Sequence, residues 1–85
     1  MIYELEYTET ALKKLKKLDK KTRKRIIAVL ERVRYSPFKY VKKLTGRKEY
    51  RLRVGDYRIL MLIDKGKLLI LVVDVGHRRN IYKKS

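Results

Sequence analysis

Side chains that could bind and act on a phosphodiester gather in the second half of this 85-residue chain. Arginine carries a permanent charge and a planar fork of donors that matches phosphate oxygens. Histidine exchanges protons near neutral pH, and a tyrosine ring can stack on a nucleobase. The residues concerned are Arg51, Arg53, Arg58, His77, Arg78, Arg79 and Tyr82.

Three short strands are expected to carry these residues, within the stretch from Tyr50 to Tyr82. Its runs are rich in Ile, Val, Leu and Tyr and have the lengths of strands. Gly55 and Gly66 mark two-residue turns between the runs, because glycine supplies the positive φ that such hairpin loops require. The stretch therefore predicts an antiparallel meander.

The expected register of this meander opposes like charges. With the first turn at Gly55, Arg53 lies opposite Arg58, an arrangement that destabilises a sheet. The side-chain period of two places Arg51, Arg53 and Arg58 on one face and, carried through the second turn, places His77 there too. A β-bulge would break this parity. A solvated outer face is the plain alternative for any single arginine, but the cluster favours an anion-binding site.

The composition of the chain points to a polyanionic partner. The chain has 25 Lys and Arg against 9 Asp and Glu, which gives a formal net charge of +16. Such a charge favours nucleic acid, and an acidic protein next. There is no cysteine and only one histidine, so neither a thiolate site nor a multi-histidine zinc site can form. We expect no metal or other cofactor.

The first half of the chain predicts one strand and two basic helices. Residues 2–7 alternate between apolar and mostly acidic side chains, as in a half-buried strand. Thr8 or Thr10 can cap a first helix, and Asp19 can cap a second, which Pro37 ends. The fold class is therefore α+β, with a helical hairpin on one face of a four-stranded sheet, in a single domain over residues 1–85.

No stretch of the chain approaches the roughly 20 apolar residues of a membrane-spanning helix. The N-terminus also lacks the basic start and apolar block of a signal peptide. We therefore expect a cytoplasmic protein with no membrane partner.

The arginine face is expected to be apolar along much of its length. The helices can cover only one face of the sheet, so part of the other should stay exposed and serve a partner protein or self-association. A sheet that curls over itself is the alternative. The apolar residues expected on the arginine face are Leu60, Leu62, Leu69, Leu71, Val73 and Val75.

Three segments together resemble the RelE/ParE superfamily of toxins, and its RelE branch in particular. They are Leu44-Thr45-Gly46, the run from Tyr50 to Arg58, and the ending from Val75 to Arg79 with Tyr82. The resemblance implies a microbial-ribonuclease-like domain, the toxin of a type II toxin–antitoxin system. It also implies cleavage of mRNA in the ribosomal A site through the 2′-OH, and a RelB-like antitoxin, acidic or amphipathic, in a higher heteromer.

The resemblance also assigns roles to residues. Arg58 matches the arginine that stabilises the phosphate in the transition state, Arg78 the arginine that assists the leaving group, and Tyr82 the tyrosine that stacks on an mRNA base. Contacts to the RNA are expected from Arg51, Arg53, Arg79, Lys42 and Lys43.

The position of the general base departs from the pattern of the family. Arg51 and Arg53 stand where RelE carries lysines, one of which is proposed as the base, and arginine does not give up its proton in proteins. His77 or Tyr82 could take the role, or no strong base exists and electrostatic stabilisation supplies the rate. For His77 a structural role at the end of the last strand is the alternative.

Two other functions stay open on the sequence. The ParE branch of the superfamily poisons a DNA topoisomerase and leaves RNA intact. A basic protein that binds RNA or the ribosome without catalysis would also explain the charge of the chain.

Overall fold

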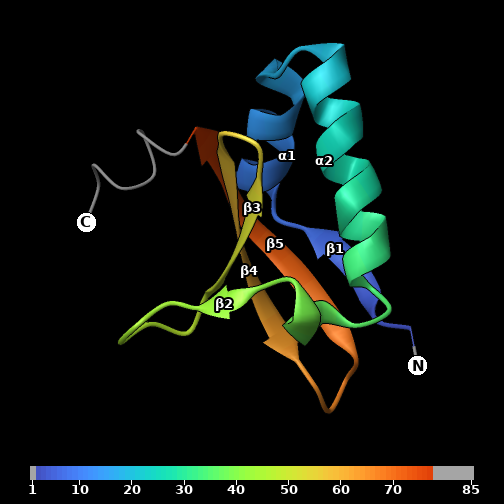
Figure 1. Ribbon diagram of the computed structural model, residues 1–85, viewed down its shortest axis with the longest axis vertical. Coiled ribbons are helices and arrows are strands. Elements are labelled where there is room, and N and C mark those ends of the chain that lie inside the picture. The colour runs from blue at the N-terminus through green and yellow to red at the C-terminus, as the bar shows by residue number, and fades with distance from the viewer. Residues whose placement is uncertain (1, 78–85) are drawn as a thin grey trace.

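The computed structural model describes residues 2–77, which form two helices, a short 3-10 turn and five strands (Figure 1). The order of elements is strand, two helices and then strands, as the sequence predicts. The elements are β1 (Glu4–Tyr7), α1 (Glu9–Lys17), α2 (Lys20–Val33), η1 (Pro37–Lys39), β2 (Lys42–Lys43), β3 (Tyr50–Val54), β4 (Tyr57–Asp64) and β5 (Leu69–His77).

One mixed sheet carries all the described strands, in the order β1-β5-β4-β3-β2. β1 runs parallel to β5, and the other neighbours are antiparallel. Both helices lie on the same face of the sheet (Figure 1). The α+β class is confirmed, but the sheet has one more strand than expected. The added strand, β2, is two residues long, too short to show a periodic pattern.

Side-chain caps begin both helices, at residues that the sequence marks. The Thr8 hydroxyl accepts a hydrogen bond from the Ala11 amide at 3.1 Å, and the Asp19 carboxylate accepts one from the Thr22 amide at 3.1 Å. Each cap satisfies an amide that has no partner within the helix. None of the helices described is long and apolar enough to cross a membrane.

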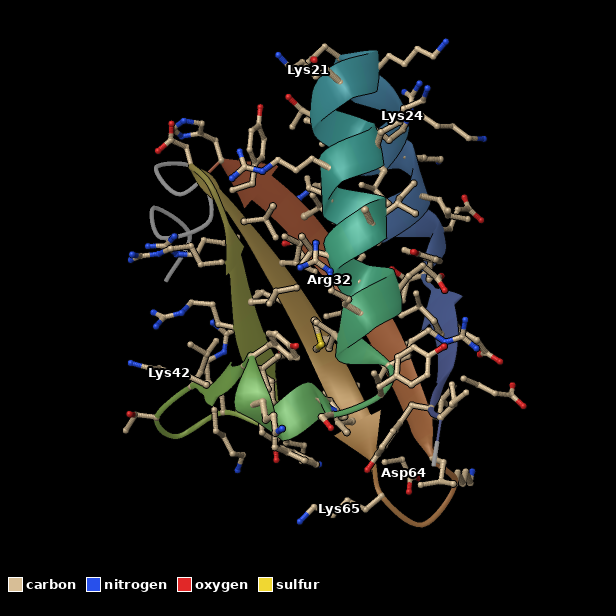
Figure 2. All side chains as sticks on the ribbon, turned by 45° about the vertical axis from the view of Figure 1, so that its right-hand side comes forward. Lys21, Lys24, Arg32, Lys42, Asp64 and Lys65 are labelled. Carbon is tan, nitrogen blue, oxygen red and sulfur yellow. The ribbon has the colours of Figure 1, made fainter. Side chains whose placement is uncertain are left out.

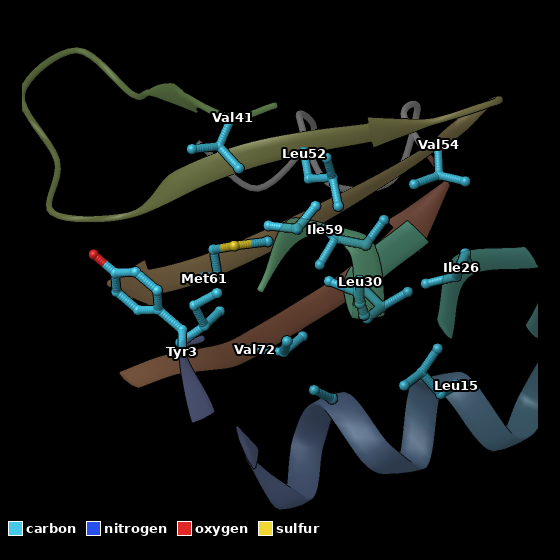
Figure 3. Close-up of a cluster of buried hydrophobic side chains, with 14 residues drawn as sticks. Tyr3, Leu15, Ile26, Leu30, Val41, Leu52, Val54, Ile59, Met61 and Val72 are labelled. Atoms are coloured by element: carbon cyan, nitrogen blue, oxygen red, sulfur yellow. The ribbon is translucent and has the colours of Figure 1, made fainter. Parts of the chain in front are cut away.

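The core lies between the two helices and the sheet. Ile26, Leu30 and Val33 of α2 are fully buried, as are Ile59 of β4 and Val72 of β5 (Figure 3). The helical period of the apolar residues in α2 predicts this buried stripe. We call the other face of the sheet, which the helices leave uncovered, the open face.

The hairpin between β3 and β4 has the predicted register. Arg53 pairs with Arg58 and Val54 with Tyr57. Gly55 has a φ of 58°, a conformation that costs glycine little and other residues more. A side chain at this position would also approach the Arg25 guanidinium to 3.0 Å. The first turn therefore sets the pairing that opposes the two arginines.

The hairpin between β4 and β5 differs from the prediction in its loop. Residues 65–68 form a four-residue turn, closed by the pairing of Asp64 with Leu69, in place of the expected two-residue loop. The positive φ falls on Leu68, at 52°, and not on Gly66. Two added loop residues preserve the parity of the register, so Leu62 and Leu71 still share the open face.

A β-bulge then reverses this parity. Met61 pairs with Val72 and Leu60 with Asp74, so Val73 has no partner in the register. The extra residue turns every later side chain of β5 to the other face. Val75 is therefore buried opposite Ile59, and the expectation that it lies on the arginine face is wrong.

Part of the open face stays exposed, as expected. Leu62 is 37% exposed, and Leu69 and Leu71 are partly exposed. These three residues and Ile63 line a groove of ≈ 460 Å³ whose rim includes Lys48 and Lys65. Leu60 departs from the expectation, because it is buried.

Candidate functional site

β3 presents two arginines on the open face because alternate residues of the strand enter the core. Leu52 and Val54 are buried against the helices, so Arg51 and Arg53 project to the other side. The register of β2 adds a third cation, since Lys42 pairs with Arg51. Figure 2 shows nitrogen-tipped side chains that extend from this part of the sheet on the side away from the helices.

Arg58 on β4 occupies the middle of the sheet. Its cross-strand partners are Arg53 on β3 and Gly76 on β5, and Gly76 adds no side chain above the sheet. Arg58 is 3% exposed and is the one charged residue buried within residues 2–77. A buried charge is uncommon in a protein interior, which makes Arg58 a candidate functional residue.

Two like-charged cross-strand pairs therefore stand side by side on the open face, Lys42 with Arg51 and Arg53 with Arg58. Lys42 and Arg53 form no ion pair within residues 2–77. Opposed like charges destabilise a sheet, and an anion bound between them would remove that repulsion. The geometry suits a phosphate group, whose oxygens match the donors of arginine.

A hollow of ≈ 220 Å³ adjoins these cations, and Tyr40 lines it together with Lys42, Arg51 and Arg53. Tyr40 is 47% exposed and immediately follows η1. Tyr40 is not among the site residues predicted from the sequence. Strand β2 has only two residues, and Tyr40 before it has helical backbone angles, so there is no alternating pattern that could have placed Tyr40.

His77 does not lie on the arginine face, and the prediction that placed it there is wrong. The bulge pairs it with Tyr57, and the two rings meet edge to face with their centroids 5.5 Å apart. Lys43 pairs with Tyr50, so it also points away from Lys42 and the arginines. Three further predicted site residues, Arg78, Arg79 and Tyr82, lie outside the described residues.

Several acidic residues are engaged in ion pairs with cations outside the open face. One of these pairs joins α1 to β5, where Lys14 Nζ lies 2.6 Å from Asp74 Oδ1. At the entry to β3, a backbone hydrogen bond and the side chain of Arg47 lower the pKa of the Glu49 carboxyl. Among residues 2–77, no group of three His, Asp or Glu side chains could hold a metal ion.

Comparison with known proteins identifies the chain as a small toxin domain of type II toxin–antitoxin systems. The family model of the ParE toxin of the parDE system matches residues 5–82. The chain therefore belongs to this toxin family, within the RelE/ParE superfamily, and solved structures of RelE toxins show that it is of the RelE type. No curated protein sequence matches the chain.

Three solved structures illustrate the similarity. A chain of the RelBE2 toxin–antitoxin complex from Mycobacterium tuberculosis is 25% identical with a TM-score of 0.85, over 92% of this chain and 100% of that one. A chain of the RelB–RelE complex from Methanococcus jannaschii is 32% identical with a TM-score of 0.74, over 93% and 96%. The isolated RelE toxin of E. coli is 28% identical with a TM-score of 0.76, over 96% and 93%.

Because like charges oppose each other in the cross-strand pairs of the open face, we expect the loss of one arginine to stabilise the protein. Replacing Arg53 by glutamine should raise the free energy of unfolding by about 0.2–1 kcal/mol at low salt, because it removes the repulsion from Arg58. Chemical denaturation measures this change. Lys48→Gln removes the same charge from a loop and should gain less. Charge repulsion would be ruled out if Arg53→Gln raised the free energy of unfolding no more than Lys48→Gln does. It would also be ruled out if the increase were unchanged in 1 M salt.

Proposed function

We propose that this toxin is an endoribonuclease that cleaves mRNA in the A site of the ribosome. The observation that carries the proposal is the pair of like-charged cross-strand contacts on the open face, with the buried Arg58 at its centre. An RNA phosphate bound between these cations would reduce their mutual repulsion, and it matches arginine in charge and geometry. The net charge of +16 favours association with the polyanionic ribosome.

In the proposed reaction the ribose 2′-oxygen attacks the adjacent phosphorus and the bond from phosphorus to the 5′-oxygen breaks. The products are a 2′,3′-cyclic phosphate and a 5′-hydroxyl, and the proton lost from the 2′-OH balances the proton gained by the leaving oxygen. Arg58 would stabilise the added negative charge on the phosphate oxygens. Arg51, Arg53 and Lys42 would hold the RNA backbone around the reacting phosphate.

The remaining roles follow the resemblance to RelE. Arg78 would support the leaving 5′-oxygen, Tyr82 would stack on a base of the mRNA, and Arg79 would contact the backbone. Lys43 faces away from the cation cluster, so its contact with RNA would lie outside that cluster.

Loss of Arg58 should reduce cleavage strongly. In a reconstituted translation reaction on a defined mRNA, Arg58→Ala should cut about 10²–10³-fold more slowly than wild type, since it removes a transition-state donor. Primer extension maps and counts the cuts, with and without ribosomes. Arg32→Ala, an exposed arginine on α2, is the matched control and should cut normally. Melting curves of both variants show whether the buried arginine is also needed for folding.

The outcomes of this experiment separate the candidate functions. Cuts in A-site codons that need ribosomes and depend on Arg58 support the proposal. A translation block with intact mRNA would instead show a ribosome-binding protein without catalysis. If translation is unaffected, DNA topoisomerase inhibition is the next assay, because the matching family model describes the ParE toxin.

Replacing His77 tests whether this residue is the general base. Because His77 lies on the face opposite the arginines and contacts Tyr57, we expect His77→Gln to cleave within about threefold of wild type and to keep its pH profile. A working general base contributes about 10²–10⁴-fold. A loss of that size, with a changed pH profile, would restore His77 as the base.

We further propose that a RelB-like antitoxin neutralises this chain and uses the apolar groove of the open face. The similar chains from M. tuberculosis and M. jannaschii come from toxin–antitoxin complexes. In this chain partly exposed leucines line the groove together with Lys48, Asp64 and Lys65, so its net charge is positive. An amphipathic segment with acidic residues therefore matches it in both hydrophobicity and charge. Occupation of the groove would also place the antitoxin next to the cation cluster.

An aspartate in the groove should weaken antitoxin binding. Leu62→Asp should raise the Kd for the co-expressed antitoxin by about tenfold or more, because it puts a charge in an apolar contact and repels acidic groups. Isothermal titration measures the change. Leu12→Asp alters a leucine of similar exposure on α1, 41% against 37%, and should leave the Kd unchanged. Equal losses in both variants would argue against this docking surface.

A further inference from the structure

Tyr40 lies beside the cations of the site. β2 and β3 pair Lys42 with Arg51, and Tyr40 lines one hollow together with Lys42, Arg51 and Arg53. Arg53 in turn pairs with Arg58, and Arg58 with Gly76. Arg53, Arg58 and Gly76 therefore form one row across the open face, and Tyr40 lies beside the Arg53 end of this row. Neighbouring strands are about 4.8 Å apart, so Arg58 lies about one strand spacing beyond Arg53.

The backbone on both sides holds the tyrosine in this position. The Tyr40 amide donates a hydrogen bond to the Pro37 carbonyl at 3.0 Å, and Pro37 is itself buried. Val41, the next residue, is buried in the core beside the helices. An exposed aromatic ring between two anchored residues loses little further conformational entropy when a ligand binds it, which favours a binding role.

The hollow beside Tyr40 suits a small planar group. Its ≈ 220 Å³ is below the roughly 300–1,000 Å³ of pockets that enclose drug-sized ligands. One wall is aromatic and the others are cationic, contributed by Lys42, Arg51 and Arg53. Single-stranded nucleic acid is bound by this combination, in which a base stacks on an aromatic ring while cations hold the backbone.

We propose that Tyr40 forms a base-stacking subsite for single-stranded RNA, occupied by a nucleotide next to the phosphate that Arg53 and Arg58 hold. This inference rests on the proposed function and adds a residue to it. Tyr40 is a positioning residue here, since it would act on the base and not on the reacting atoms. The subsite would align the ribose and phosphate over the row of arginines.

Binding of an RNA that cannot be cleaved tests the subsite separately from catalysis. The probe is a five-nucleotide RNA with 2′-fluoro riboses and a central 2-aminopurine, whose fluorescence falls when the base stacks. A second probe has an abasic residue at the central position and an end label for anisotropy. Both are titrated with wild type and variants away from the ribosome, at one fixed salt concentration.

We expect Tyr40→Ala to bind the 2-aminopurine RNA about fivefold or more weakly, within the range of about 5- to 150-fold that stacking on one aromatic residue provides. The fluorescence loss seen with wild type should disappear. Tyr40→Phe should bind within twofold of wild type, because it keeps the ring. Wild type and Tyr40→Ala should bind the abasic RNA equally well.

Two control variants separate stacking from structural effects. Tyr40→Leu keeps apolar bulk without an aromatic face and should behave like Tyr40→Ala. Tyr35→Ala removes a more exposed tyrosine, 63% exposed, from a separate hollow that shares no residue with this one, and should bind like wild type. The subsite is refuted if Tyr40→Ala and wild type bind the 2-aminopurine RNA alike, or if Tyr40→Ala loses as much affinity for the abasic RNA.

The outcome is independent of the cleavage assay. A wild-type protein that stacks the base through Tyr40 but cuts no mRNA would preserve the subsite and refute the nuclease. Cleavage that depends on Arg58 together with binding that ignores Tyr40 would preserve the nuclease and refute the subsite.

Discussion

The bulge at Val73 is the constraint on which the layout of the site depends. Up to Val72 the residues of β5 follow one register with β4, and from Asp74 onward the register is shifted by one residue. The shift exchanges which residues of β5 face the helices and which face the open side. The beginning of α1 holds the bulge in place. The Thr8 hydroxyl, which caps this helix, donates to the Val73 carbonyl at 3.2 Å, and Lys14 pairs with Asp74. Val73 has no partner in the register, and its carbonyl group is instead hydrogen-bonded to the first residue before the helix. As a result Val75 enters the core, and Gly76, with no side chain, lies beside Arg58.

The two faces of the sheet have opposite tasks. The closed face buries Leu52, Ile59 and Val72 against the helices and supplies the hydrophobic stabilisation that a domain of this size needs. The open face combines like-charged cross-strand pairs with partly exposed leucines, and both features reduce the stability of the isolated domain. Local rules of sheet stability are broken on one face only, and such violations are expected where a protein binds or reacts. The toxin family of this chain is consistent with that interpretation.

The sequence predicted those features that depend on short-range patterns. Helical periodicity and capping residues placed both helices, and Gly55 set the register that opposes Arg53 to Arg58. The resemblance to RelE agreed with the family found by comparison. The side of His77 was predicted wrongly, because parity assumes uninterrupted alternation, and the bulge depends on contacts with Thr8 some 65 positions away. β2 and Tyr40 were missed since a two-residue strand leaves no period to read.

The proposed reaction has to proceed without an evident base among the described residues that face the phosphate. Arg51 and Arg53 replace the lysines expected by resemblance, and arginine stays protonated. His77 faces Tyr57 on the other side of the sheet. Electrostatic and positional effects are nevertheless large. One well-placed donor contributes about 2.7–4 kcal/mol, and alignment of the reacting groups contributes up to about 7–11 kcal/mol. In-line attack by the 2′-oxygen depends on the RNA conformation, which the ribosome could impose. A site that stabilises charge but lacks a strong base would then be active mainly on RNA that is already aligned, which would tie the toxin to translating ribosomes.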